Sequence, residues 1–230
     1  MRNHSVWILS LSLFLLWGCA GGQPEREEQA ERGHDDGATV HRRFDDAEVW
    51  AGRFEDPGRD AWQRPQRVLE LLRLKPDARV ADVGAATGYF PVRFAAAVPR
   101  GVVYGVDVEP TLVNYLSLRA HREGLSNLIA LVCQPDDPCL PEPVDLVFVC
   151  DTYHHIGARV DYFTRLKQSL RPGGRLAIVD FRPGDFPVGP KDPHKLPAEA
   201  VIAELAKAGY ALTLRNDELP YQYVLVFAPR

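Results

Sequence analysis

The chain has 230 residues, with 27 Lys and Arg against 31 Asp and Glu, which gives a formal net charge of −4. Because no basic run or basic face stands out, a nucleic acid is a poor candidate for the partner. Hydrophobic residues make up 46% of the chain, and about 190 residues remain after the N-terminal 40, which fits one folded domain.

The first 18 residues have the pattern of an export signal. They start with the charged Arg2 and continue in an apolar run that is too short to span a bilayer. The run ends in LWGC, which resembles the bacterial lipoprotein signal, although Trp17 is bulkier than that pattern usually carries. The resemblance implies that Cys19 is lipidated and becomes the new N-terminus. An ordinary secretory signal or an uncleaved anchor is the alternative.

The resemblance also implies a location for the protein. Ala20 after the cysteine favours the outer membrane, so we expect a lipid-anchored protein of the bacterial cell envelope on its periplasmic face. If the signal is not used, the protein stays in the cytoplasm. Residues 19–40 carry charge and glycine but almost no large apolar side chain, and they predict a flexible tether. The folded domain is then expected over 41–230, with leading helices in 41–75.

Three cysteines lie within the expected domain: Cys133, Cys139 and Cys150. They form no CxxC pair, which argues against a zinc site. In an oxidising compartment, Cys133 and Cys139 could close a short loop as a disulfide. Buried free thiols are the alternative, and the sequence leaves both open.

Two helices are expected before the first strand, over residues 43–54 and 60–74. In the second, Asp60 is a plausible N-cap and Pro65 fits the first turns. Strands and helices then alternate. The sequence predicts strands at 79–83, 101–108, 127–133, 144–150, 175–180, 211–216 and 221–228, and helices at 90–98, 111–125, 159–170 and 198–210.

The strands are nearly continuous apolar runs, as in parallel sheets that helices cover on both faces. Only DELP, residues 217–220, joins the last two strands. That connection is too short for a helical crossover, so these strands should pair antiparallel. We therefore predict an α/β fold with a doubly wound, seven-stranded, mostly parallel sheet that ends in an antiparallel hairpin. This arrangement resembles the class I S-adenosylmethionine-dependent methyltransferases of the small-molecule type.

The stretch RVADVGAATGYF, residues 79–90, carries the most specific part of the resemblance. The family has an acid followed by three alternating glycines after its first strand; Asp82, Gly84 and Gly88 match, while Ala86 replaces the middle glycine. Such a turn lets a cofactor approach the backbone at the start of a helix. The alanine methyl adds little bulk if its φ is negative. The resemblance makes these four residues and Tyr89 candidate cofactor-binding residues; a glycine turn that serves packing alone is the alternative.

Acids at later strand ends extend the candidate cofactor site. Asp107 ends the second predicted strand, where a carboxylate can accept hydrogen bonds from both ribose hydroxyls. By resemblance to the family, Asp136 or Asp137, after the third strand, contacts the adenine amino group. The surrounding PDDP also favours a simple turn, so either residue or neither could do so.

The fourth strand is followed by DTYHH, residues 151–155. Residues just past the carboxyl ends of central strands line the ligand crevice of such sheets. We expect Asp151 to contact the cofactor, and His154 and Tyr153 to be catalytic: His154 as a base toward the acceptor, Tyr153 facing the sulfonium. A histidine that only fixes the loop is the alternative. The adjacent His154 and His155, with His194 as a possible third ligand, invite a metal site, but neighbouring histidines rarely point at one ion, so none is predicted.

The leading helices contribute Trp50, Phe54, Trp62 and Gln63, which could cover the cofactor or simply pack in the core. The resemblance covers about residues 60–228. It implies an enzyme that transfers a methyl group from S-adenosylmethionine to a small-molecule or lipid-like acceptor.

Two other functions stay open. Because the cofactor is made in the cytosol and the leader predicts export, the alternative is a non-catalytic, lipid-anchored binding protein on the same scaffold. A nucleotide-dependent oxidoreductase is disfavoured, since its G-x-G-x-x-G spacing is absent.

Overall fold

The computed structural model describes residues 46–191 and 194–230. The expected export signal, Cys19 and the expected tether lie outside these residues. The described residues all fall within one compact unit.

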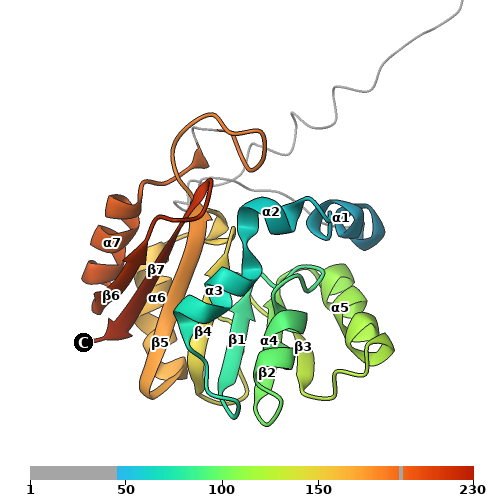
Figure 1. Ribbon diagram of the computed structural model, residues 1–230. Helices are drawn as coiled ribbons and strands as arrows, with labels where there is room; N and C mark the ends of the chain where they lie inside the picture. Colours follow the sequence, from blue (N-terminus) through green and yellow to red (C-terminus); the bar gives the residue numbers. More distant parts are fainter. Residues whose placement is uncertain (1–45, 192–193) are drawn as a thin grey trace, which may run out of the picture. The chain divides into compact units, whose positions relative to one another are not determined.

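A seven-stranded sheet in the order β3-β2-β1-β4-β5-β7-β6 forms the centre of the fold (Figure 1). The first five strands in this order run parallel, and β7 is antiparallel to both β5 and β6. This confirms the predicted fold class, including the C-terminal hairpin. The strands are β1 (Arg79–Val83), β2 (Val102–Asp107), β3 (Leu128–Val132), β4 (Val144–Cys150), β5 (Leu170–Phe181), β6 (Tyr210–Asn216) and β7 (Gln222–Pro229).

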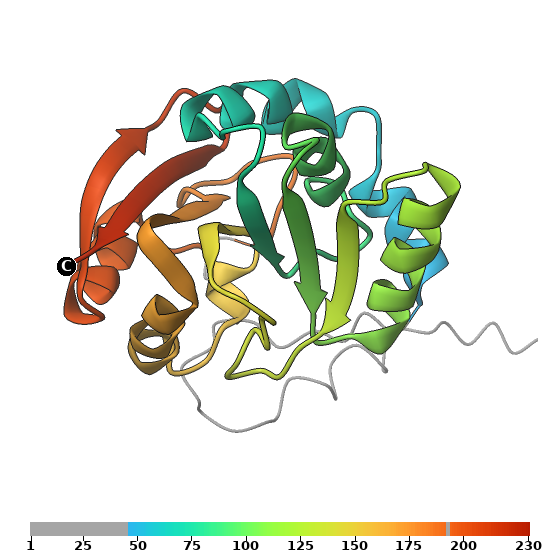
Figure 2. The same ribbon diagram turned by 90° about the horizontal axis from the view of Figure 1, so that it is seen from below.

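Helices cover both faces of the sheet (Figures 1 and 2). The apolar cluster on one face takes in Phe94 and Leu116, and the cluster on the other takes in Phe163 and Leu205. Central strands therefore bury side chains on both sides, which explains their continuous apolar runs. One face carries α3 (Pro65–Leu72), α4 (Pro91–Ala97) and α5 (Pro110–Arg122), and the other carries α6 (Arg159–Leu166) and α7 (Ala198–Lys207).

Two short helices, α1 (Ala47–Phe54) and α2 (Arg59–Gln63), lie above the carboxyl ends of the parallel strands (Figure 1). The N-cap of α1 is Asp46, whose carboxylate accepts a hydrogen bond from the backbone N–H of Val49 at 3.2 Å. Ligands bind at this edge of open α/β sheets. The helices are thus placed to cover a site there.

The helix predicted over 60–74 is wrong as a single element. The chain breaks between α2 and α3 at Arg64, which has a left-handed φ of 45°, and Pro65 begins α3. Proline disfavours the α conformation in the residue before it, which explains the break. Asp60 is not an N-cap, because it lies inside α2 and Gly58 precedes that helix.

In the described part of the chain, no helix is both long and apolar enough to cross a membrane. All three cysteines of the domain are free thiols in the structure. Cys133 and Cys150 are buried, and Cys139 is exposed.

Candidate active site

The turn after β1 has the backbone that a close-approach loop requires. Gly84 and Gly88 have φ of 78° and 100°, in the region that only glycine adopts freely. A Cβ at Gly84 would overlap the side chain of Thr152, and one at Gly88 would overlap that of Leu116. The N–H groups of Gly84 and Ala85 donate to the carbonyl of Val106 at 2.9 and 3.1 Å, which joins the turn to β2.

The alanine at position 86 was expected to fit the turn if its φ is negative. Its φ is +47°, not negative. An L-residue in this conformation brings its Cβ close to the following carbonyl, at a cost of roughly 1–2 kcal/mol. The middle position of the turn is therefore strained by the missing glycine, although the turn itself is formed.

Asp107 lies against this turn, as the sequence predicts. Its Oδ2 accepts a hydrogen bond from the N–H of Ala86 at 2.9 Å, and its Oδ1 accepts one from the N–H of Glu109 at 3.0 Å. The residue is only 7% exposed. Burial raises the pKa of its carboxyl, and the two backbone N–H groups act against this shift. Each carboxylate oxygen retains a second lone pair, enough to accept a hydroxyl.

Asp82 is buried deeper, at 3% exposed. Burial raises its pKa to about 8; the nearby Arg59 opposes this rise, and the charge of Asp107 adds to it. A cation that binds beside Asp82 therefore stabilises the charged form of this carboxyl group.

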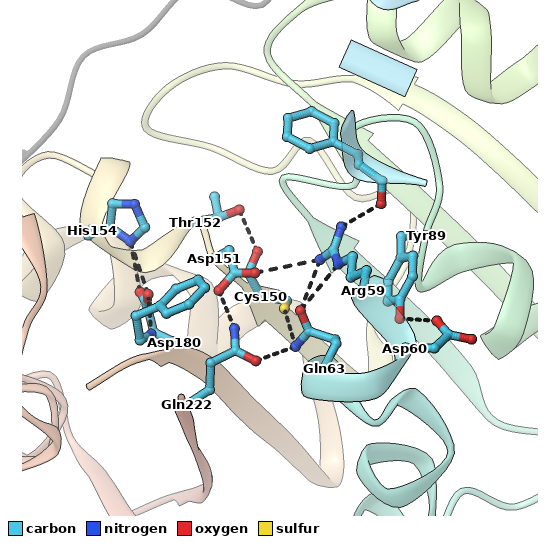
Figure 3. Close-up of polar contacts among 12 residues, drawn as sticks. Arg59, Asp60, Gln63, Tyr89, Cys150, Asp151, Thr152, His154, Asp180 and Gln222 are labelled. Carbon is cyan, nitrogen blue, oxygen red and sulfur yellow. Dashed lines mark hydrogen bonds and ion pairs between the residues drawn. The ribbon is translucent and has the colours of Figure 1, made fainter. Parts of the chain in front are cut away.

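Four side chains close a ring above β4 and β7 (Figure 3). Gln222 donates from Nε2 to Oδ1 of Asp151 at 2.5 Å and accepts from Nε2 of Gln63 at 2.5 Å. Oε1 of Gln63 accepts from Nε and Nη2 of Arg59 at 3.3 and 3.2 Å. Nη2 of Arg59 lies 3.5 Å from Oδ2 of Asp151. The ring fastens α2 to the strand ends.

Asp151 keeps an exposed edge within this ring, because its side chain is 23% exposed. Burial of the rest raises its pKa to about 6, and the charge of Arg59 opposes the rise. Its φ of 53° is left-handed. Strained backbone of this kind is often held at binding sites by the surrounding structure.

Tyr89 follows the glycine turn and lies under Arg59, whose Cζ is 3.8 Å from the centre of its ring. Arg93 also lies over this ring, at 4.0 Å. The tyrosine hydroxyl donates to Asp60, which also pairs with Arg93 at 2.9 Å. The ring of Tyr89, at the predicted cofactor site, is therefore fixed by cation–π contacts with Arg59 and Arg93.

His154 lies in the short 3₁₀ helix η2 (Tyr153–His155) and contacts the end of β5. Its Nδ1 is 3.0 and 3.1 Å from the two carboxylate oxygens of Asp180, and both residues are buried. Burial lowers the pKa of His154, but the charge and hydrogen bond of Asp180 outweigh it and leave the pKa raised.

Tyr153 does not face the crevice, against the expectation for a catalytic residue. Its side chain is fully buried, stacks on Phe163 at 5.2 Å and donates its hydroxyl to Glu204 at 2.7 Å. Glu204 on α7 also pairs with Arg159. The tyrosine therefore joins η2 to α7, and its buried ring, packed against Phe163 and Arg159, leaves no open face for a sulfonium.

Asp136 and Asp137 are both exposed. Oδ1 of Asp137 accepts from the N–H of Cys139 at 2.8 Å, and the backbones of Gln134 and Asp137 bond to each other. This is the geometry of the turn that PDDP favours. Contact of either acid with adenine stays a prediction.

The four residues expected either to cover the cofactor or to pack in the core lie in α1 and α2. Trp50 stacks on Phe54 at 5.4 Å within α1, and Trp62 lies against Phe181 and Tyr221 at 5.5 and 6.3 Å. Gln63 belongs to the ring above β4. In the described residues, no group of three or more potential metal ligands is found.

Three residues of this site carried no prediction: Arg59, Asp180 and Gln222. Asp180 could have been found, because it lies near the carboxyl end of an apolar strand, as Asp82 and Asp107 do. Arg59 and Gln222 belong to no motif. Their roles arise only when α2 and β7 meet over Asp151.

Fold and site together define an α/β domain whose candidate cofactor site lies at the carboxyl ends of β1, β2 and β4. A family model described as "Methyltransferase domain" matches residues 74–214. The chain therefore belongs to this methyltransferase family.

Individual relatives agree with this assignment. The chain is 33% identical to a tRNA U34 carboxymethyltransferase of Desulfotalea psychrophila over 55% of this chain and 39% of that one. It is 30% identical to a malonyl-[acyl-carrier protein] O-methyltransferase of Methylococcus capsulatus over 67% and 48%. The chain thus spans about half the length of the curated relatives it matches.

Solved structures place the fold in the same family. A SAM-dependent methyltransferase from Aquifex aeolicus has a TM-score of 0.74 and 26% identity, and covers 80% of this chain and 98% of its own. These findings confirm the expected class of domain and its cofactor, S-adenosylmethionine.

Proposed function

We propose that this chain transfers the methyl group of S-adenosylmethionine to a small-molecule acceptor. One observation carries the proposal: the small-residue turn after β1 and the carboxylate of Asp107 lie in direct contact at adjacent strand ends. A turn of small residues admits the cofactor, and the carboxylate gives its ribose two acceptors. Val108, next to Asp107, is 47% exposed and offers apolar surface to the adenine.

The proposed reaction is an in-line displacement. The acceptor atom forms a bond to the methyl carbon while the carbon–sulfur bond breaks, and the bond's electron pair stays on sulfur as the neutral thioether. The protein contributes alignment and the exclusion of water. For a hydroxyl acceptor, His154 is the candidate base, and Asp180 holds its Nδ1.

The acceptor class is inferred from charge and from the relatives. The net charge of −4 gives no electrostatic footprint for a nucleic acid. Several relatives bear names of small-molecule enzymes, among them an aklanonic acid methyltransferase and a ubiquinone/menaquinone biosynthesis C-methyltransferase. Others are named for tRNA, so tRNA is the alternative substrate to include in an assay.

A thermal-shift and calorimetry experiment tests the cofactor site. The full-length chain should melt at a higher temperature with S-adenosylhomocysteine and unchanged with NAD. Asp107→Ala should weaken S-adenosylhomocysteine at least about a hundredfold, because two hydrogen bonds to a charged acceptor are lost. Asp77→Ala, at an exposed turn before β1, is the control. If S-adenosylhomocysteine does not change the melting temperature of the wild-type chain, the result supports the alternative of a non-catalytic binding protein.

Methyl transfer itself is tested by release of S-adenosylhomocysteine from S-adenosylmethionine with a panel of small hydroxyl, carboxyl and carbon acceptors, and with tRNA. Turnover with tRNA alone would overturn the proposed acceptor class. His154→Gln should lower turnover while leaving the affinity for S-adenosylhomocysteine unchanged.

We also propose that the protein is lipid-anchored in the cell envelope through Cys19, on the strength of the LWGC pattern. Radioactive palmitate fed to expressing bacteria should label the wild-type chain and fail to label Cys19→Ser. An unlabelled wild-type chain refutes the anchor.

A further inference from the structure

Aromatic side chains from separate segments meet beside the candidate active site, at the end of β5 and the start of β7. The ring centre of Trp62 in α2 lies 5.5 Å from that of Phe181 and 6.3 Å from that of Tyr221. Tyr221 lies 5.1 Å from Phe186. Phe181 is buried, whereas the other three side chains are half-buried. These four residues, the aromatic cluster, therefore keep exposed apolar surface.

The connection between β5 and α7, residues 182–197, packs onto the aromatic cluster. Figure 1 shows this connection, coloured orange, at the same end of the sheet as α2. Its Gly189 has a φ of 90°, and a Cβ there would overlap the ring of Phe181. The N–H of Arg182 donates to the carbonyl of Tyr221 at 3.0 Å. The connection is thus fixed to both strands that flank the cluster.

The aromatic cluster adjoins two polar parts of the candidate site. Cζ of Arg59, a member of the ring above β4, lies 5.8 Å from the centre of the Trp62 ring. On the other side, the N–H of Phe181 donates to Oδ1 of Asp180 at 2.8 Å. Asp180 in turn contacts His154, the candidate base. A compound bound on the cluster therefore lies next to that base.

Lys195 brings a cation to the aromatic cluster. The residue is only 7% exposed. Its Nζ lies 4.8 Å from the ring centre of Phe186 and donates to the carbonyl of Gly184 at 2.5 Å. The carbonyl of the next residue, Leu196, accepts from the hydroxyl of Tyr223 in β7 at 3.2 Å. The lysine is therefore held in place at the edge of the cluster.

The ammonium of Lys195 has no counter-ion in the part of the chain that the structure describes. Of its three N–H donors, one reaches the carbonyl of Gly184. The arginines nearby differ, because Arg93 and Arg159 each pair with a carboxylate, at 2.9 and 2.7 Å. A charge withdrawn from water without an ionic partner is costly. An anion at this point would satisfy the donors that remain.

We infer that Lys195 and the aromatic cluster form the subsite for the methyl acceptor, and that the acceptor is a planar aromatic compound with a carboxylate. The ring of the acceptor packs on the exposed surface of the cluster, and its carboxylate pairs with the ammonium. The inference rests on the proposed function and deepens it, because it names the chemical class of the acceptor.

The competing explanation is that Lys195 only fastens the connection between β5 and α7 through the carbonyl of Gly184. Its loss would then loosen the connection and weaken charged and neutral ligands alike. A subsite for an anion predicts instead that only the charged ligand binds more weakly.

Two probe ligands of the same shape separate these explanations. 2-Naphthoate carries a carboxylate on a planar aromatic body, and 2-naphthamide carries a neutral amide in its place. For the full-length chain saturated with S-adenosylhomocysteine, isothermal titration should show 2-naphthoate binding at least about tenfold more tightly than 2-naphthamide, as expected for a charge-assisted pair. Acetate should show no measurable binding, because it lacks the aromatic body.

Lys195→Met should remove the preference, so that the two naphthyl probes bind within about twofold of each other. Lys195→Gln should also remove it, although its amide can still donate to Gly184, and this variant serves if circular dichroism shows that Lys195→Met does not fold. Lys191→Met is the matched control, because Lys191 is an exposed lysine of the same connection. It should leave the ratio of the two affinities unchanged.

The outcomes are distinct. The inference is overturned if the wild type binds S-adenosylhomocysteine but binds both naphthyl probes equally or neither, if acetate binds as tightly as 2-naphthoate, or if the Lys195 variants keep the wild-type preference. In each of these cases the proposed function stands. If the wild type binds no S-adenosylhomocysteine, the proposed function fails, and the acceptor role of the subsite fails with it.

Discussion

A glycine in place of Ala86 tests whether the left-handed backbone at this position strains the turn. Ala86→Gly should raise the free energy of unfolding by about 1 kcal/mol, because relief of the left-handed strain exceeds the extra backbone entropy of glycine in the unfolded chain. For a chain of this size that corresponds to roughly 2–4 °C in melting temperature. Urea denaturation and thermal melts measure both.

Arg73→Gly provides the comparison, since Arg73 has the same φ of 47° at the exposed C-cap of α3. It should stabilise the chain by a similar amount. A loss of stability in Ala86→Gly together with a gain in Arg73→Gly would mean that the Ala86 methyl makes packing contacts worth more than the strain.

A second residue-scale prediction concerns the His154–Asp180 pair. Asp180→Asn should lower the pKa of His154, because the carboxylate charge that overcomes burial is removed. An NMR titration of the His154 ring in wild type and variant measures this. Asp185→Asn, in the exposed loop after β5, should leave the titration unchanged. An unchanged His154 titration in Asp180→Asn would contradict the assigned contact.

Residues of the site differ in how well the sequence predicts them. Asp82 and Asp107 could be found because each lies near the carboxyl end of an apolar strand, and these ends meet at one edge of the sheet. Arg59 could not, because a single arginine on a polar leading segment has no pattern. Tyr153 was assigned wrongly, because its position past β4 fixes the backbone but not whether the side chain turns toward the crevice or toward α7.

At the scale of elements, the ring above β4 explains how a five-residue helix stays in place. An isolated helix of this length does not persist in water. Arg64 and Pro65 also prevent α2 from continuing into α3. The apolar stripe of this segment, Val68, Leu69, Leu71 and Leu72, lies entirely after the break, so only the effect of Pro65 on its neighbour could have revealed it.

The ring predicts a coupled loss of stability. Gln222→Leu should cost about 1–3 kcal/mol, because it leaves the buried amide of Gln63 and a carboxylate oxygen of Asp151 without their partner. The double variant with Gln63→Leu should cost less than the sum of the single variants. Urea denaturation of the four chains gives this cycle.

Gln66→Leu, at an exposed position of α3, should stay within about 0.5 kcal/mol of the wild type. If the two single costs add without coupling, the contact between Gln63 and Gln222 does not hold α2.

For the whole molecule, the buried carboxylates connect stability to pH. Asp82 has an ordinary pKa of 3.8 that is raised to about 8 in the fold. The folded chain therefore binds this proton more tightly than the unfolded chain. Its contribution to stability is fully present below about pH 4 and is lost as the pH rises toward 8. The unliganded fold is thus less stable where the acids of its binding site are charged.

Asp82→Asn should remove this dependence, because the amide resembles the protonated acid at every pH. The variant should melt slightly above the wild type at pH 5 and well above it at pH 9, while Asp77→Asn at an exposed turn should follow the wild type throughout. Addition of S-adenosylhomocysteine at pH 8 should raise the melting temperature of the wild type above that of the variant. The ammonium of the ligand compensates the ionised carboxylates of the wild type and is stabilised less by the amide of the variant. Melts from pH 5 to 9 with and without ligand provide the measurement. If the melting temperatures of the wild type and Asp82→Asn change in parallel across this range, Asp82 is ionised in the empty site. Its charge is then already compensated by the protein without the cofactor.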